Sequence, residues 1–367
     1  MKTPVLYCIF NRLDVVKKTF EPIRAARPER LYIAADGPRL DKPGEKELTE
    51  KVRKYILDNV DWDCEVKTLY RDKNIGCELA MSGAVAWFFS YEEKGIILED
   101  DILTCPEFFQ FCEQMLNFYE NSDNITYISG YNFLSNITES CNSYYFLPEA
   151  QACGWATWRK VLYPEKHNVM YNYIPNIKDY HSLVNRGRII KTITKRKDLQ
   201  SALYYDLFFE SRWDNNFISY LLTHFPNAYS IMPSKSLTSH IGDNGYHFNG
   251  ENNFDIPIDN FDMENLIFGK AIEPDREFQD LLLEKIFYSE CFRKYGRENI
   301  DVKAVKQDYY KIKSDIITSF LKWFYYRSIK FMKKRAKTIQ EQYLYNKYLL
   351  TTIEPFYIYT KYYYKKS

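Results

Sequence analysis

Three consecutive carboxylates, Glu99-Asp100-Asp101, are the side chains of this sequence best suited to bind a cation. They follow the apolar run 95–98, which is typical of a strand buried in a sheet. Carboxylates this close together repel one another, so such a cluster normally requires a cation. Because no His or Cys stands beside them, they favour Mg²⁺ or Mn²⁺, which could neutralise a diphosphate leaving group. The alternative is a solvated acidic turn.

Asp36 and Arg12 also come after apolar runs that are typical of strands. Asp36 follows the run 31–35 and precedes Gly37. Its carboxylate could accept a hydrogen bond from the ring N–H of a nucleobase, and the glycine would let a ligand approach the backbone. The alternative is a turn that closes the strand. Arg12, shortly after the run 5–10, could bind phosphate oxygens, although a lone surface arginine is the commoner outcome.

Asp214 lies between two apolar stretches, residues 203–209 and 217–222, and directly follows Trp213. An aspartate held by packed aromatic rings could act as a general base towards a hydroxyl group. The alternative is an N-cap for the helix that the second stretch predicts.

Two further segments hold residue types that bind sugars or close over ligands. Gly154 precedes Trp155, and a second indole, Trp158, follows three residues later. Indole faces stack on sugar rings, but core packing is their more frequent use. The segment 239–247 holds two of the five histidines and two glycines: His240, Gly242, Gly245 and His247. Such a loop could close over a ligand and exclude water, or it could have no task.

The first 130 residues alternate between apolar runs and amphipathic segments. Strands are predicted at residues 5–10, 31–35, 66–70, 95–98 and 125–129, and helices at 14–26, 45–59 and 77–91. This alternation indicates βαβ units, and hence an α/β fold whose mostly parallel sheet binds ligands beyond the C-terminal strand ends. The turns after these strands contain neither GxGxxG nor GxxxxGK[ST], which disfavours the dinucleotide fold and the P-loop.

Several short motifs occur in an order that resembles N-acetylglucosaminyltransferase I-like enzymes, in particular bacterial glycosyltransferases of the GT-A fold. The motifs are CIFNR at 8–12, ADG at 35–37, EDD at 99–101 with PEFF at 106–109, GW at 154–155, WD at 213–214, and IG at 241–242 with His247. The likeness covers roughly residues 3 to 250, and the order and spacing of the motifs carry it.

The resemblance implies a Rossmann-like GT-A fold and an inverting, metal-dependent transfer from a UDP-sugar. It implies Asp101 as the direct ligand of Mn²⁺ (or Mg²⁺) and Asp214 as the base that takes the acceptor hydroxyl proton. The implied donor site comprises Arg12 along the nucleotide, Asp36 at the uracil, Glu99 and Asp100 at the ribose and sugar, Gly154 and Trp155 in the sugar pocket, and His240, Gly242 and His247 in a segment that orders over the diphosphate. Two departures are Asn215, where the family has a second acid, and Cys77-Glu78, where a His contacts uracil.

Charge is divided unevenly along the chain. The whole sequence has 50 Lys+Arg and 49 Asp+Glu, and this net charge of +1 argues against a nucleic-acid-binding protein. Residues 317–367 contain 11 basic and 2 acidic residues, so this tail carries a net charge of +9. A basic, aromatic helical tail would suit docking on an anionic membrane surface. The alternative is a solvated helix that packs on the rest of the chain.

The eight cysteines form no CxxC pair, and the sequence has neither a signal-peptide pattern nor a transmembrane stretch. We therefore expect a reduced, cytoplasmic protein, peripheral on the inner face of the plasma membrane. The expected domains are a GT-A domain at 1–270 and, at 271–367, a helical region with the docking tail.

The expected function is that of a hexosyltransferase. It would move a sugar from a UDP-sugar to a glycan or lipid-linked glycan acceptor in bacterial surface polysaccharide synthesis, such as that of lipopolysaccharide or capsule. One alternative is a metal-dependent phosphodiesterase or nuclease, which would bring more carboxylate and His ligands around two cations. The other is a non-enzymatic carbohydrate-binding protein, which would need neither the acidic triplet nor Asp214.

Overall fold

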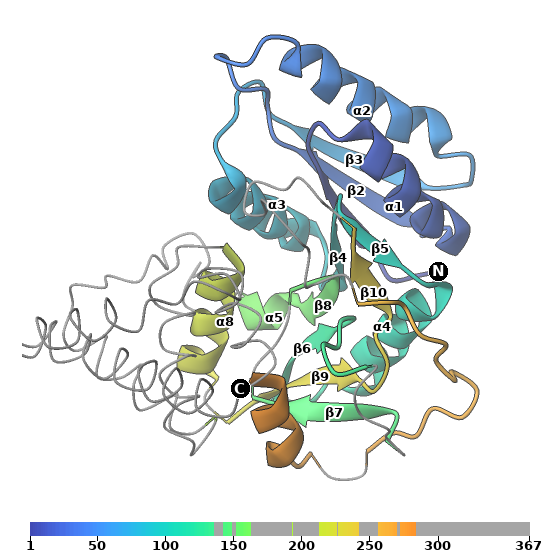
Figure 1. Ribbon diagram of the computed structural model, residues 1–367, viewed down its shortest axis with the longest axis vertical. Coiled ribbons are helices and arrows are strands. Elements are labelled where there is room, and N and C mark those ends of the chain that lie inside the picture. Colours follow the sequence, from blue (N-terminus) through green and yellow to red (C-terminus); the bar gives the residue numbers. More distant parts are fainter. Residues whose placement is uncertain are drawn as a thin grey trace, which may run out of the picture. The chain divides into compact units, whose positions relative to one another are not determined.

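The computed structural model of the chain describes residues 1–135, 142–148, 152–162, 193, 213–225, 227–241, 256–269 and 272–283 (Figure 1). The chain divides into two compact units, residues 1–173 with 212–275, and residues 174–211 with 276–367. Of the second unit, residues 276–283 are helical. The predicted helical region beyond 283, including the basic tail, lies outside the described residues.

The described part of the first unit contains an eight-stranded sheet with the order β3-β2-β1-β4-β8-β6-β9-β7. Its strands are β1 (Val5–Ile9), β2 (Arg30–Ala35), β3 (Glu65–Tyr70), β4 (Lys94–Glu99), β6 (Ile125–Ser129), β7 (Tyr144–Leu147), β8 (Trp155–Trp158) and β9 (Tyr229–Pro233). The first four strands in this order are parallel, and only β8 and β7 run against the other strands. The predicted α/β fold with a mostly parallel central sheet is therefore confirmed.

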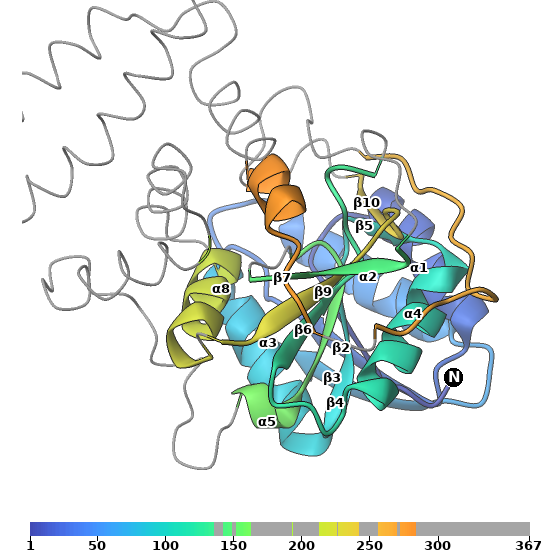
Figure 2. The same cartoon turned by 90° about the horizontal axis from the view of Figure 1, so that it is seen from below.

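Helices cover both faces of this sheet (Figures 1 and 2). One group is α1 (Leu13–Ala26), α2 (Glu45–Asn59) and α4 (Pro106–Phe118); the other is α3 (Cys77–Tyr91), α5 (Arg159–Leu162) and α8 (Trp213–His224). All five residues of β1 are buried because helices lie on both of its faces, which explains its continuous apolar sequence.

The sheet has a topological switch point between β1 and β4. From β1 the chain passes through α1 to β2 on one side, whereas β4 pairs with β1 on the other. In open α/β sheets, ligands bind in the crevice that such a reversal leaves at the C-terminal strand ends. A two-stranded sheet of β5 (Ile102–Thr104) and β10 (Thr238–His240) begins at this point, directly after the acidic turn.

None of the described helices combines the length and the hydropathy that a membrane span requires.

Candidate active site

The acidic triplet lies at the switch point of the sheet. Glu99 is the last residue of β4 and pairs with Cys8 of β1, while Asp100 and Asp101 form the turn into β5. Arg12 follows the C-terminal end of β1 and immediately precedes α1. The sequence therefore predicts correctly that these polar side chains gather at one edge of the sheet.

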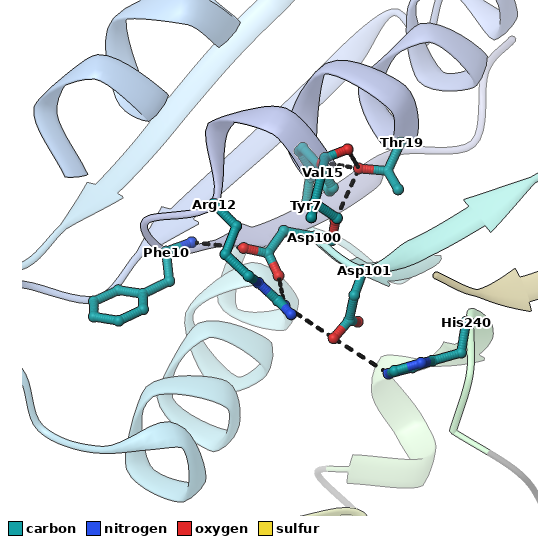
Figure 3. A network of polar contacts seen from close by, with 8 residues as sticks. All are labelled: Tyr7, Phe10, Arg12, Val15, Thr19, Asp100, Asp101 and His240. Atoms are coloured by element: carbon teal, nitrogen blue, oxygen red, sulfur yellow. Dashed lines mark hydrogen bonds and ion pairs between the residues drawn. The ribbon is translucent and has the colours of Figure 1, made fainter. Parts of the chain in front are cut away.

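Arg12 binds both aspartates of the turn (Figure 3). Its Nη2 donates to Asp100 Oδ1 and, over 2.9 Å, to Asp101 Oδ2. Asp100 Oδ2 also accepts the backbone N–H of Phe10 at 3.1 Å. Burial raises the pKa of Asp100 despite the opposing charge of Arg12. The cation that an acidic cluster requires is thus supplied, at least for two of its members, by a guanidinium of the chain itself.

His240 approaches the same turn from β10. Its Nε2 lies 3.3 Å from Asp101 Oδ2, and the backbone N–H of Ile241 donates to Asp101 O at 2.9 Å. Pairing of His240 with Ile102 across β10 and β5 holds it there. Burial alone would raise the pKa of Asp101, but the hydrogen bond and charge of His240, and then of Arg12, hold it below its usual range. The predicted Gly242 and His247 lie outside the described residues.

Two buried hydroxyl groups fix the backbone of the turn (Figure 3). Thr19 Oγ1 lies 2.9 Å from Asp100 O and 2.6 Å from the Tyr7 hydroxyl. Thr19 has one hydroxyl proton, and when it donates this to Asp100 O, the Tyr7 hydroxyl must donate to Thr19. Sequence reasoning missed both residues. Thr19 is a polar residue on the buried stripe of α1, between Val16 and Phe20, and that position was the available signal.

Asp214 lies in the first turn of α8, so the N-cap alternative is wrong: the helix begins at Trp213. Helix α8 packs against α3. Desolvation, followed by the charges of Asp101 and Asp214, raises the pKa of Glu99 well above its usual value. Asp214 is therefore close enough to the acidic turn to act on it electrostatically.

Trp155 is a core residue that supports this arrangement. Its side chain is 1% exposed, and its ring stacks with Tyr127 at 5.1 Å and with Trp213 at 6.0 Å between centroids. The indole of Trp155 therefore serves core packing, which is the more frequent use of an indole. Its Nε1 is buried and has no hydrogen-bond partner among the residues that the structure describes. Trp155 thus fixes Trp213, and through it the start of the helix that carries Asp214.

Gly154 is explained by close packing in a backbone conformation that favours glycine. Its φ is +77°, and a Cβ there would lie 2.9 Å from Thr238 Cγ2. Its carbonyl accepts the N–H of Gly130 at 2.8 Å. The residue therefore joins the loop after β6 to the strand β10 that carries His240.

Asp36 closes the turn after β2 and ties it to the loop after β3. Its Oδ1 accepts the N–H of Gly37 at 2.9 Å, and both its oxygens lie 3.2 Å from the N–H of Ile75. A Cβ on Gly37 would lie 2.3 Å from the backbone N of Lys73. The expectation that this glycine makes room for a ligand is wrong at that position, because another segment of the chain fills the space.

The donor set of the turn suits a hard divalent cation. Asp101 Oδ1 and the carboxyl group of Glu99 have no hydrogen-bond partner in the described part of the chain. Within that part, no three or more His, Cys, Asp or Glu residues form a ready metal site. Mg²⁺-type cations are usually held by one or two carboxylates together with substrate phosphates and water. Asp101 therefore fits such a cation only if the ligand completes its shell.

Comparison with known proteins gives weak similarities. No protein-family model and no curated protein matches the sequence. The solved structure of HddC from Yersinia pseudotuberculosis is 10% identical, over 47% of this chain and 86% of that one, with a TM-score of 0.29. Mannosyltransferase PcManGT from Pyrobaculum calidifontis, in complex with GDP-Man and Mn²⁺, is 10% identical over 61% of this chain and 70% of that one, with a TM-score of 0.34. TarS of S. aureus is 11% identical over 57% and 44%, with a TM-score of 0.33. The proposals below rest on the residues of the chain itself.

Proposed function

We propose that this chain is a glycosyltransferase of the GT-A fold that moves a sugar from a nucleotide diphosphate to a hydroxyl group. The observation that carries the proposal is the acidic turn at the switch point, with Asp214 within electrostatic reach of Glu99. A cation-binding carboxylate and a separate carboxylate base are the two groups that such a transfer needs. A carbohydrate-binding protein needs neither.

The transfer would invert the configuration at the anomeric carbon. Asp214 takes the proton of the acceptor hydroxyl while the acceptor oxygen attacks the anomeric carbon. The bond from that carbon to the diphosphate oxygen breaks, and its electron pair goes to the diphosphate. The diphosphate leaves with that negative charge, and the proton remains on Asp214 until solvent removes it. A half-buried carboxylate in the first turn of a helix, fixed by the stacked rings of Trp213 and Trp155, is held in position for this task.

A divalent cation, Mn²⁺ or Mg²⁺, would be held by Asp101 and would offset the charge on the leaving diphosphate. Glu99 and Asp100 would bind the ribose and the sugar, and the buried Gly154 and Trp155 would support this pocket from the core. The carboxylate of Asp100 is already held in one position by the Phe10 N–H and by Arg12. His240 would orient Asp101 from the other side.

The donor base would be read by Asp36. An ionised carboxylate only accepts hydrogen bonds, so it selects bases with a ring N–H such as uracil. Among the described residues, Asp36 Oδ2 accepts the Ile75 N–H alone, so in that part of the chain it retains a lone pair for such a contact. A UDP-sugar is therefore the proposed donor.

The acceptor would be a glycan or lipid-linked glycan of a bacterial surface polysaccharide. The basic tail at 317–367 would dock the enzyme on the anionic inner face of the plasma membrane, where such acceptors are found. Binding to anionic liposomes, measured with and without residues 317–367, tests this docking. Equal binding of the two proteins would refute it.

A panel of UDP-sugars, each incubated with the protein and Mn²⁺, tests the proposed function through release of UDP. We expect hydrolysis of one donor, its loss with EDTA, and its loss in Asp101→Ala. Asp214→Asn should retain donor binding and lose transfer. The matched control is Asp61→Asn, which removes an exposed carboxylate paired with Arg24 and should change neither. Turnover by Asp214→Asn at the wild-type rate would show that Asp214 is not the base.

A further inference from the structure

The position of the Asp36 carboxylate depends on two loops at the C-terminal edge of the sheet. One is the turn after β2, at residues 36–38, and the other is the loop of residues 71–76 between β3 and α3. Both oxygens of Asp36 lie 3.2 Å from the N–H of Ile75. The direction of this carboxylate is therefore set in part by the loop after β3.

The loop after β3 has little support from the core. In the described sheet, β3 is an edge strand, and none of its six residues is buried. An edge strand is paired along one side only, so its other row of backbone N–H and C=O groups has no partner strand. A contact from outside the sheet therefore has a large influence on where this loop lies.

Arg53 of helix α2 makes such a contact and joins the two loops. Its Nη2 donates to Asp36 O at 3.0 Å and to Arg71 O at 2.8 Å. Its guanidinium also lies over the ring of Tyr70, 4.8 Å from the centroid. Hydrogen bonds from a charged donor are stronger than those between neutral groups, so this one nitrogen is an effective clamp.

The charge of Arg53 has no acidic partner in the described part of the chain. Its polar contacts there are the two carbonyl groups of the two loops, and its Nε is buried without a hydrogen-bond partner. An arginine that served the surface charge or an ion pair would have a carboxylate beside it. The placement of Arg53 instead fixes the distance between the turn that holds Asp36 and the loop after β3.

We propose that Arg53 is a positioning residue for the recognition of the nucleobase. It holds the loop after β3 against the turn after β2, so that the Asp36 carboxylate faces a base with a ring N–H. This inference rests on the proposed function, in which Asp36 reads the base of the donor. Arg53 itself acts through the two carbonyl groups and does not touch the nucleotide.

The preference for UDP over CDP tests this role, measured by isothermal titration of each nucleotide into the full chain with Mn²⁺. Uracil offers a ring N–H to the carboxylate and cytosine does not, so the wild type should bind UDP more tightly. We expect Arg53→Met, which keeps the bulk of the side chain but no donor, to raise the Kd for UDP by about tenfold or more. That is the usual value of one hydrogen bond to a charged group. The Kd for CDP should change little.

Two further measurements separate positioning from a general loss of stability. Arg53→Lys retains a charged donor within the same helix, so it should restore most of the preference for UDP. In the Asp36→Asn background, which has no carboxylate to position, Arg53→Met should not change the ratio of the two Kd values further. In turnover, Arg53→Met should raise the KM for the UDP-sugar and leave kcat unchanged.

Arg159→Met is the matched control. Arg159 is a part-buried arginine whose Nε also donates to a backbone carbonyl, Glu92 O, at 3.0 Å. That carbonyl precedes the N-terminal end of β4, at the opposite edge of the sheet from Asp36. We expect Arg159→Met to lower the Tm and to keep the wild-type ratio of the Kd values. Arg53→Gln replaces Arg53→Met if the latter does not fold, and its ratio should lie between those of Arg53→Met and the wild type.

The positioning role is refuted if the folded Arg53 variants keep the wild-type ratio, or if they lose affinity for UDP and CDP equally. It is also refuted if the wild type does not distinguish the two nucleotides, including the case in which it binds neither. A failed donor panel has a separate meaning. If no UDP-sugar is turned over but the preference for UDP falls in Arg53→Met, the proposed transferase is wrong and the positioning role of Arg53 stands.

Discussion

Replacing Thr19 by valine would remove the hydroxyl group that joins β1, α1 and the acidic turn while keeping the shape of the side chain. Thr19 is 1% exposed and its Oγ1 contacts both the Tyr7 hydroxyl and Asp100 O. The substitution leaves a buried donor and a buried acceptor without partners. Each unsatisfied buried group costs about 1–3 kcal/mol, so the two together should lower the free energy of unfolding by about 2–6 kcal/mol.

Urea unfolding followed by circular dichroism measures this loss, and Thr49→Val is its control. Thr49 is also fully buried in a helix of the same layer, but its Oγ1 donates only to Lys46 O of its own helix, at 2.8 Å. Its removal strands no partner, so we expect a loss below about 1 kcal/mol.

A double-mutant cycle with Tyr7→Phe tests whether the two hydroxyl groups act as one chain of hydrogen bonds. Contacting residues in one network typically show coupling of about 0.5–3 kcal/mol. The reasoning is refuted if Thr19→Val costs no more than Thr49→Val, or if the Tyr7 and Thr19 substitutions are additive.

Other substitutions test other parts of the site. Gly37→Ala would place a Cβ 2.3 Å from the Lys73 backbone, and we expect a loss of about 1–3 kcal/mol in urea unfolding; an unchanged free energy of unfolding would contradict the chain-crossing explanation. Glu99 has a raised pKa in the folded protein, so its contribution to stability is present below its unfolded pKa and is lost as the pH rises through the folded pKa. Glu99→Gln should therefore raise the metal-free Tm at neutral pH and change it little near pH 4, where the usual pKa of a glutamate lies, whereas an equal change at both pH values would refute this role. Asp101 has a lowered pKa, so the stability it contributes is present above its unfolded pKa and is lost as the pH falls through the folded pKa. Asp101→Asn should destabilise the metal-free protein at neutral pH but not under strongly acidic conditions; a loss independent of pH, as measured by Tm, would contradict this.

The sheet and its first helices could be predicted because each has a clear period in the sequence. The helices predicted at 45–59 and 77–91 and the strand predicted at 125–129 have the same bounds in the structure. The strand β8 was not predicted. Trp155 and Trp158 at its ends could be interpreted either as core residues or as ligand-binding residues. Its antiparallel place between β4 and β6 depends on pairing that no local pattern encodes.

The members of the site were predictable in part, since the residues after β1, β2 and β4 must meet at one edge of a parallel sheet. Which of these side chains form hydrogen bonds or ion pairs with one another could not be predicted. Arg12 was predicted to lie along the nucleotide, and its contacts with Asp100 and Asp101 within the chain were not predicted. His240 reaches Asp101 only through the pairing of β10 with β5, between residues far apart in the sequence. Such long-range contacts decide the electrostatics of the site and lie beyond local patterns.

Isothermal titration of UDP into the protein with Mn²⁺ tests the central claim, that the acidic turn binds a nucleotide diphosphate through a divalent cation. The account predicts binding that disappears with EDTA and in Asp101→Ala, and that persists in Asp214→Asn, because the base does not contact the nucleotide. Absence of UDP binding by the wild type with Mn²⁺, or binding that Asp101→Ala leaves unchanged, would contradict it.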